Sequence, residues 1–411
     1  MKSTSWAGGI AATCLALSSL TTGVARSAGP AQPIPCEAVA VAHAPSRDVL
    51  CVARHIDSPA TGPTGVDVNF SHDGGRTWKN AAATGLPTAA TSVFTAADFS
   101  LNYAADHRMF VQEAASGLYM SSDGGATFTA LDPLASNAYN FRNLNPIWLP
   151  APLANTPLGG AGLALAGNPA AIVLPPSHIP VPEPDDVVAF LPVGKPGSTE
   201  AVYAVVGTSP AVPHVSVLAC TNALVCSRTV YVGPDGYLLT GVNSQPEDPR
   251  NVGTLGLASF TEHHSITLTI DRSGTVTRQA ALDVAISNRP SLDPMTNLVA
   301  VLTAPASPGA LLALLTCSPR EANLACDALF TSRDKGRSWK PVTVSRTHER
   351  SWDTGALPAA AGGARTDRAG MSVGSRHELY LIGTPAGTFT GLTGAFYCST
   401  DGGRTWHVRC R

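Results

Sequence analysis

The sequence predicts an all-β fold assembled from repeating units of about fifty residues. A template of eight residues occurs four times in the chain, which indicates a repeat architecture. Gly (38 residues) and Pro (33 residues) are abundant, as expected for many turns between short strands. Before the first template, Val66, Val68 and Phe70 alternate with Asp67 and Asn69, the pattern of a strand with one buried face.

The first element along the chain is an export signal at residues 1–27 rather than part of the fold. A basic residue precedes an apolar stretch from Trp6 to Leu20, and small residues follow. This order is typical of a secretory signal peptide, with cleavage expected after Ala25 or Ser27. The apolar stretch is short for a membrane span. We therefore expect a secreted or extracytoplasmic protein of bacterial type, with no membrane span after cleavage.

The repeated template ends in an aromatic residue and holds Ser, Asp and Gly at fixed positions. Asp and Ser side chains stabilise tight turns through hydrogen bonds to nearby backbone groups, and Gly adopts positive φ without strain. The aromatic residue begins the returning strand and can fill the core beside it. Each copy therefore predicts a β-hairpin. The fixed positions are Ser71, Asp73, Gly75 and Trp78; Ser121, Asp123, Gly125 and Phe128; Ser332, Asp334, Gly336 and Trp339; and Ser399, Asp401, Gly403 and Trp406.

This template resembles the Asp-box, or BNR, repeat of sialidases and other β-propellers. The resemblance implies a β-propeller in which each Asp-box lies on the hairpin between the two outer strands of a blade. That position is peripheral and distant from the central pocket. The aspartates of the four boxes are accordingly expected to be structural rather than catalytic.

The spacing of the boxes predicts a single propeller over residues 28–411 with seven four-stranded blades, and six blades as the alternative. The first two boxes begin 50 residues apart and the last two 67 residues apart. Between Ser121 and Ser332 lie 211 residues, enough for about four intervals of propeller length.

Decayed copies of the repeat are expected in that long interval. One hairpin is predicted from residues 215–220 and 226–232, and a second from residues 265–271 and 275–282. A blade without an Asp-box is expected near position 171. The prolines that follow it disfavour central strands.

Eight cysteines remain once the signal is removed, and an even number in an exported protein indicates disulfides. Their spacing favours pairing between neighbours. An alternative joins Cys36 to Cys410, because the two ends of the chain must meet to close a ring. No Cys-x-x-Cys motif or His cluster accompanies them, so neither a metal site nor a cofactor is expected. The neighbour pairs are Cys36 with Cys51, Cys220 with Cys226, Cys317 with Cys326, and Cys398 with Cys410.

The resemblance to sialidases implies a catalytic set of three arginines, a Tyr/Glu nucleophile pair and an aspartic acid. The arginine that opens this set, in an Arg-Ile-Pro motif, has no counterpart in the opening segment of this chain. Arg54 and Asp57 loosely resemble the family's arginine-then-aspartate segment. Glu378 and Tyr380 are two residues apart and so share a strand face, which makes them nucleophile candidates. The placement of Glu378 and Tyr380 matches no motif of the family.

Composition and charge narrow the function classes. A formal net charge of −2 provides no electrostatic footprint for nucleic acid. Three interpretations remain: a non-catalytic propeller that binds a glycan, a peptide or an envelope component; a divergent sialidase-like exo-glycoside hydrolase; and an assembly or scaffolding propeller. The first is favoured, with a carbohydrate or protein ligand and a monomeric chain expected.

Overall fold

The structure is a computed structural model of the 411-residue chain. It divides into two units, Met1–Ala31 and Gln32–Arg411, and the first lies outside the described residues. The export signal predicted at residues 1–27 therefore stays a prediction. The structure describes residues 34–42, 46–55, 64–88, 94–113, 117–132, 143–148, 161–166, 170–174, 177–181, 187–192, 202–207, 214–221, 225–244, 252–259, 264–279, 297–303, 311–316, 328–333, 340–341, 371–373, 378–383, 395–401, 407 and 409–410.

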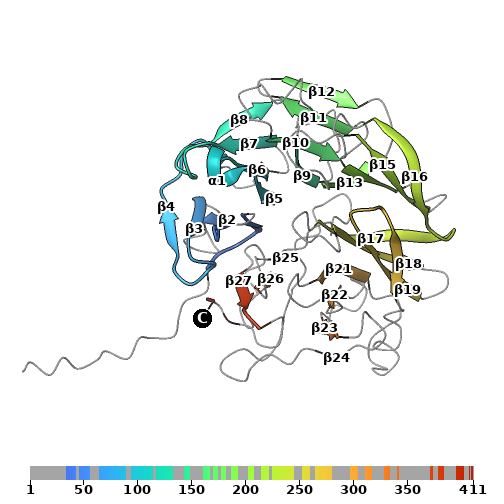
Figure 1. Ribbon diagram of the computed structural model, residues 1–411. Coiled ribbons are helices and arrows are strands. Elements are labelled where there is room, and N and C mark those ends of the chain that lie inside the picture. The colour runs from blue at the N-terminus through green and yellow to red at the C-terminus, as the bar shows by residue number, and fades with distance from the viewer. Residues whose placement is uncertain are drawn as a thin grey trace, which may run out of the picture. The chain divides into compact units, whose positions relative to one another are not determined.

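The described residues form seven antiparallel sheets, six of four strands and one of three (Figure 1). Strands that follow one another in the chain are neighbours in each sheet. The first two sheets comprise β1 (Ala38–Val41), β2 (Val49–His55), β3 (Gly65–Ser71) and β4 (Lys79–Ala81), and β5 (Phe94–Phe99), β6 (Met109–Glu113), β7 (Gly117–Ser121) and β8 (Thr129–Asp132). The next two comprise β9 (Asn143–Trp148), β10 (Ala161–Ala166), β11 (Ala170–Leu174) and β12 (Ser177–Val181), and β13 (Val187–Pro192), β14 (Val202–Gly207), β15 (Val215–Cys220) and β16 (Cys226–Val232).

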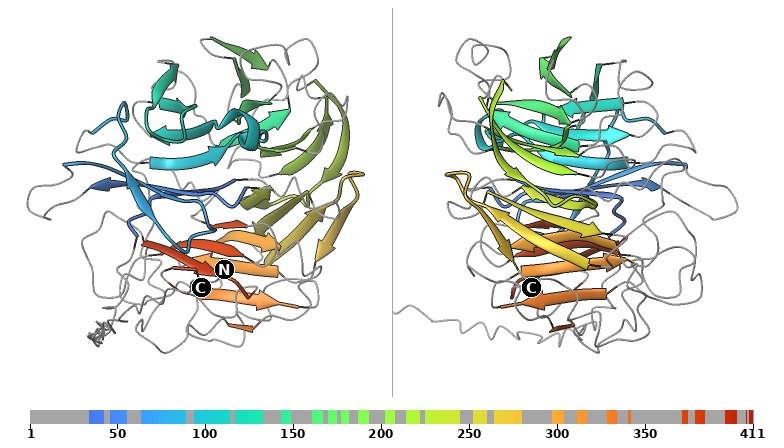
Figure 2. Two further views of the ribbon diagram at one scale, coloured as in Figure 1. Left: turned by 60° about the vertical axis from the view of Figure 1, so that its left-hand side comes forward. Right: turned by 90° about the vertical axis from the view of Figure 1, so that its right-hand side faces the viewer.

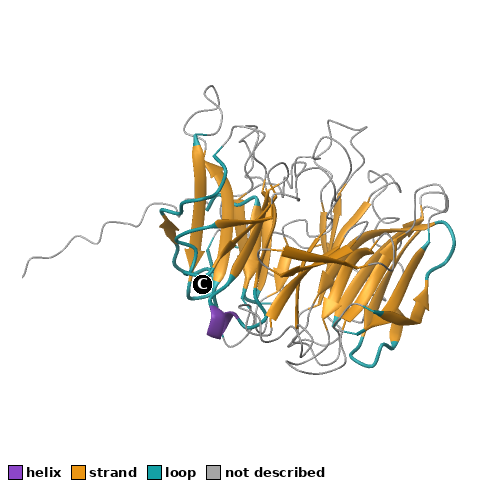
Figure 3. Ribbon diagram, turned by 90° about the horizontal axis from the view of Figure 1, so that it is seen from above, coloured by secondary structure: helices purple, strands orange, loops and turns teal. Residues whose placement is uncertain are grey.

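The remaining three sheets continue the same pattern to the end of the chain. They comprise β17 (Tyr237–Ser244), β18 (Gly253–Ser259), β19 (His264–Ile270) and β20 (Val276–Gln279); β21 (Asn297–Thr303), β22 (Leu311–Thr316), β23 (Ala328–Ser332) and β24 (Lys340–Pro341); and β25 (Met371–Val373), β26 (Leu379–Gly383) and β27 (Ala395–Ser399). The one helix among the described residues, α1 (Tyr103–Asp106), joins β5 to β6 (Figure 3). No described helix is long and apolar enough to cross a membrane.

The first strands of successive sheets contact one another in order: β1, β5, β9, β13, β17, β21 and β25. Strand β25 also contacts β1, so the seven described sheets close into a ring. This is the arrangement of blades in a propeller. The all-β prediction is confirmed, whereas the number of blades in the whole chain stays a prediction because some stretches lie outside the described residues.

The hairpins predicted in the long interval between boxes are present. Strands β15 and β16 have the predicted bounds, and the disulfide Cys220–Cys226 joins them at the turn. Strands β19 and β20 pair with Ile270 opposite Val276. The sheet β9–β12 lies where a blade without an Asp-box was expected, and Pro180 lies in its edge strand β12, where proline is tolerated.

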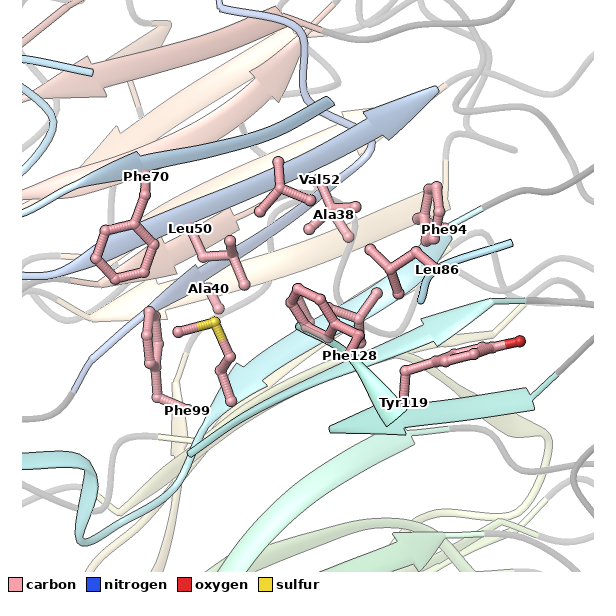
Figure 4. Close-up of a cluster of buried hydrophobic side chains, with 14 of the residues drawn as sticks. Ala38, Ala40, Leu50, Val52, Phe70, Leu86, Phe94, Phe99, Tyr119 and Phe128 are labelled. Carbon is pink, nitrogen blue, oxygen red and sulfur yellow. The ribbon is translucent and has the colours of Figure 1, made fainter. Parts of the chain in front are cut away.

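The core between the first two sheets shows why the alternating pattern folds as it does. Strand β3 buries Val68 and Phe70 in the same cluster as Phe99 of β5, with 6.2 Å between the two phenylalanine ring centroids (Figure 4). Phe128, the aromatic residue of the second box, is buried in this cluster. A buried aromatic side chain contributes about 2 kcal/mol to stability. Because a reversed strand would expose these side chains to water, their burial fixes which face of β3 packs against the second sheet.

A second core cluster lies between the first and last sheets, at the seam that closes the ring. It contains side chains from β1 and β2 and from β26 and β27. The blue strands of the first sheet lie next to the red strands of the last sheet in Figures 1 and 2. Outside the strands, Ile34 accepts a hydrogen bond from the backbone N–H of Phe396 (2.9 Å). The start of the described chain therefore pairs with its last strand.

Three of the four predicted disulfides lie within the described residues, and each joins the predicted neighbours. Their partners are Cys36–Cys51, Cys220–Cys226 and Cys398–Cys410. The alternative pairing of Cys36 with Cys410 is wrong, because both cysteines are engaged locally. The predicted pair Cys317 and Cys326 lies outside the described residues.

Candidate functional site

The first Asp-box lies between β3 and β4, the two outer strands of the first sheet. Ser71 Oγ donates to Asp73 Oδ1 (2.8 Å) and accepts the backbone N–H of Gly75 (2.7 Å). Asp73 Oδ1 also accepts the backbone N–H of Thr77 (2.9 Å), and Thr77 Oγ1 donates to Asp73 Oδ2 (2.7 Å). The polar side chains of Ser71, Asp73 and Thr77 thus form hydrogen bonds within the turn itself.

The second box, between β7 and β8, has the same geometry. Ser121 Oγ donates to Asp123 Oδ1 (2.8 Å), which accepts the backbone N–H of Thr127 (2.9 Å). Hydrogen bonds from the Thr127 hydroxyl and backbone hold the pKa of Asp123 at about 2. In the first box, burial acts to raise the pKa of Asp73, but the hydrogen bonds from Thr77 and Ser71 outweigh it and lower the pKa to about 2. Both aspartates are ionised parts of a turn.

The other two boxes are described in part. In the fourth, Ser399 Oγ donates to Asp401 Oδ1 (2.8 Å), as in the first two. In the third, Ser332 ends β23. A turn without the full template behaves alike, since Asp271 Oδ1 accepts the backbone N–H of Ser273 (2.8 Å) and of Thr275 (2.9 Å). The remaining fixed positions of the two C-terminal boxes lie outside the described residues: Asp334, Gly336, Trp339, Gly403 and Trp406.

Arg54, one of the catalytic candidates, binds a carboxylate of its own chain. It lies near the end of β2, and its Nε is 2.6 Å from Oε1 of Glu37, which precedes β1. Both side chains are buried, with 4% and 5% of their surfaces exposed. The other carboxylate oxygen of Glu37 accepts the backbone N–H of Phe94 (3.5 Å), at the start of the second sheet. The ion pair therefore fastens the inner strands of two neighbouring sheets.

The electrostatics of this pair are dominated by burial. Burial raises the pKa of Glu37 above its ordinary value, although the adjacent Arg54 charge and its hydrogen bond act to lower it. A buried ion pair loses so much hydration that its mutual attraction rarely repays the loss. The removal of one partner is nevertheless costly, because a lone charge stays behind in the interior.

A polar group lies beside this pair at the same end of the first sheet. His55, next to Arg54 in β2, places Nδ1 2.9 Å from Asp67 Oδ2. Asn80 donates to Asp67 Oδ1 (2.7 Å), so the carboxylate is held from both sides. The His55 side chain is 45% exposed.

Tyr380 and Glu378, the nucleophile candidates, lie at the seam between the first and last sheets. Tyr380 is 1% exposed, its ring packs 5.7 Å from that of Phe396, and its hydroxyl donates to the carbonyl of Gly74 (3.4 Å). Burial is the main cause of the raised pKa of this tyrosine. The Glu378 carboxylate pairs with Arg47, in the connection between β1 and β2. Both side chains therefore stabilise the packing between the first and last sheets.

The fourth candidate, Asp57, lies outside the described residues. Glu37 and Asp67 were not among the sequence candidates, although Glu37, just before β1, pairs with Arg54 and Asp67, on β3, contacts His55. A charged residue at the edge of an otherwise apolar run, as in Cys36-Glu37-Ala38, is the signal that could have indicated a buried partner. Among the described residues, no group of three or more His, Cys, Asp or Glu side chains could hold a metal ion.

The comparisons with known proteins agree with the fold. The family model of the BNR/Asp-box repeat matches residues 397–408, the fourth box. A puromycin hydrolase structure superposes with a TM-score of 0.52 at 11% identity, over 93% of this chain and 54% of that one. The chain is a β-propeller with Asp-box repeats. At that level of identity, the likeness shows the fold alone.

Other propeller structures are similar at lower scores. The GH74 enzyme of Niastella koreensis covers 90% of this chain and 64% of its own length, with 12% identity and a TM-score of 0.43. YCF48 from Cyanidioschyzon merolae covers 73% of this chain and 82% of its own length, with 11% identity and a TM-score of 0.40. The propeller thus spans less than two thirds of the GH74 enzyme and of the puromycin hydrolase. No curated protein matches the sequence.

Proposed function

We propose that this propeller is an extracytoplasmic, non-catalytic binding protein, whose ring of sheets is a scaffold for a carbohydrate or peptide ligand. The Arg54–Glu37 ion pair carries the proposal. A sialidase-like site needs guanidinium groups that face the carboxylate of the substrate. The guanidinium of Arg54 is buried and its Nε is bound to Glu37 (2.6 Å). Its partner Glu37 also accepts the backbone N–H of Phe94, so Arg54 belongs to the contact between the first two sheets.

The second catalytic candidate supports the same conclusion. A tyrosine nucleophile must reach the substrate and must lose its proton readily. Tyr380 is 1% exposed, and burial raises its pKa. Its hydroxyl donates to a backbone carbonyl of the first Asp-box. These are the properties of a core tyrosine.

The extracytoplasmic location rests on the disulfides together with the predicted signal peptide. Three cysteine pairs of the described chain are bonded. Stable disulfides are typical of oxidising compartments and rare in the cytosol.

Equilibrium binding to an array of oligosaccharides and extended peptides tests the proposal. The full chain is compared with the double variant Glu37→Met and Arg54→Met, which replaces the pair by apolar side chains of similar length. We expect saturable retention on at least one class of probe, and the same retention by the double variant. Retention by neither class would overturn the proposal, and so would a loss of sialic acid from the sialylated probes.

A further inference from the structure

Two disulfides meet in one buried cluster at the seam between the first and last sheets. Cys36 and Cys51 belong to the first sheet and its preceding segment, and Cys398 and Cys410 to the last sheet and its following segment. All four are at most 5% exposed, and all four pack in the same core cluster, with Trp78 at its border.

Each disulfide fixes a chain end that bonds the opposite sheet. On one side, Cys36 follows Ile34 by two residues, and the Ile34 carbonyl accepts the Phe396 N–H (2.9 Å). On the other side, the Cys410 N–H donates to the carbonyl of Gly75 (3.0 Å), in the first Asp-box. The two hydrogen bonds are reciprocal: the N-terminal segment binds the last sheet, and the C-terminal segment binds the Asp-box of the first sheet.

The remaining side chains at the seam depend on this arrangement. Trp78 packs edge-on against Phe396, with 4.7 Å between ring centroids, and its Nε1 donates to the Gly75 carbonyl (3.0 Å). The Gly75 carbonyl therefore accepts from Trp78 of its own sheet and from Cys410 of the last. A shift of the C-terminal segment changes the surroundings of that carbonyl directly, and a shift of the N-terminal segment reaches it through Phe396 and Trp78.

We propose that closure of the ring depends on oxidation. The disulfides Cys36–Cys51 and Cys398–Cys410 hold the chain ends where each bonds the opposite sheet, and in the reduced protein the seam between the first and last sheets opens. A chain end without its disulfide gains conformational freedom, which weakens the backbone hydrogen bond and the packing that it contributes to the opposite sheet.

The redox step is a thiol–disulfide exchange. A cysteine thiolate attacks a small-molecule disulfide such as oxidised glutathione, and the second cysteine of the pair then displaces the remaining glutathione. One Sγ–Sγ bond forms in the protein and one breaks in the oxidant. The two cysteines lose two electrons, and their two protons pass to the two glutathione thiols. Because the four cysteines are buried in the closed ring, the exchange takes place while the seam is open.

The third disulfide is a matched control. Cys220–Cys226 joins neighbouring strands within one sheet, across the turn between β15 and β16. Its residues belong to a sheet in the middle of the chain order, distant in sequence from both ends. Its loss removes a covalent link of the same kind without a link at the seam.

Hydrogen exchange in protein labelled with 15N-phenylalanine and 15N-tryptophan tests the proposal. In the paired variant Cys36→Ala and Cys51→Ala, the Phe396 amide should exchange at least about tenfold faster. In the paired variant Cys398→Ala and Cys410→Ala, the Trp78 indole N–H should do the same. The paired variant Cys220→Ala and Cys226→Ala should leave both within about twofold of the wild type. A failure of either seam probe to respond overturns the proposal.

A second measurement uses the unaltered chain, in case the seam variants do not fold. The oxidised protein is titrated with dithiothreitol, free thiols are alkylated, and peptides are identified by mass spectrometry. We expect Phe396 to lose its protection in the same step in which Cys36 and Cys51 become alkylated. Protection of Phe396 that persists after their alkylation contradicts oxidation-dependent closure.

Discussion

The backbone carbonyl of Gly75 accepts a hydrogen bond from the N–H of Cys410, the penultimate residue of the chain, at 3.0 Å. Gly75 has a φ of +84°, a backbone conformation that residues other than glycine rarely adopt. A Cβ on this glycine would lie 2.8 Å from Cys410 Sγ and 3.0 Å from the ring of Phe396. An Asp-box turn is thus also a contact surface for the sheet that closes the ring.

The variant Gly75→Ala should destabilise the protein by about 3 kcal/mol, from backbone strain together with displacement of the last sheet. Gly125→Ala is the matched control, because Gly125 holds the same position in the second box with a φ of +89°. A Cβ there meets only the end of the flexible Met109 side chain, with the sulfur at 3.4 Å and Cε at 3.8 Å. We expect Gly125→Ala to cost about 1 kcal/mol, from strain alone. Urea unfolding measures both, and equal losses contradict the contact at the seam.

Because Glu37 and Arg54 form an ion pair, we expect the effects of replacing each of them on the free energy of unfolding to be non-additive. Glu37→Met alone should destabilise the protein by about 3 kcal/mol, because it leaves the buried charge of Arg54 without its carboxylate. The double variant Glu37→Met and Arg54→Met should recover most of that loss, since no charge remains in the interior. Arg228→Met, at an exposed position of β16, serves as the control and should change stability by less than about 0.5 kcal/mol. A double variant less stable than the single one contradicts this account.

Acid should weaken the Asp-box turns in a defined window. Asp73 and Asp123 have a pKa of about 2 in the folded protein, below the ordinary value of 3.8. A lowered pKa contributes stability that is complete above the ordinary value and is lost as the pH falls toward the folded value. The free energy of unfolding should therefore decline between about pH 4 and about pH 2.

The variant Asp73→Asn and Asp123→Asn isolates this effect, because asparagine keeps an acceptor oxygen and does not titrate in this range. Its unfolding free energy should depend less steeply on pH over the same window. Denaturant titrations at a series of pH values compare the two proteins. An unchanged slope would mean that the box aspartates are not the groups responsible.

Most of the fold could be predicted from the repeat pattern in the sequence. The Ser-x-Asp-x-Gly template fixes its turn through bonds among residues at most four apart in sequence, as between Ser71 and Gly75, so the local sequence suffices to predict it. The same reason explains the hairpin at Cys220 and Cys226, whose strands follow each other directly. Local alternation likewise predicted the burial of Val68 and Phe70, but Asn69 between them is buried as well, because its side-chain amide donates to the Pro35 carbonyl (3.3 Å).

The candidate site was less predictable, because its contacts join residues that are distant in the chain. Tyr380 is buried by Phe396 and by Gly74 of the first sheet, and no pattern near Tyr380 indicates that neighbour. The partner of Arg54 is Glu37, 17 residues earlier in the segment before β1, and the path of that segment decides whether the two side chains meet. Such relationships depend on how the ring closes.

Release of sialic acid from a fluorogenic sialoside tests the central claim most directly. The claim is that Arg54 and Tyr380 are structural residues of a binding propeller. The full chain should release no more product than buffer does at any pH from about 4 to about 8, and the double variant Glu37→Met and Arg54→Met should behave alike. A rate above that of buffer, abolished in the double variant, would contradict the account and assign Arg54 to a catalytic site.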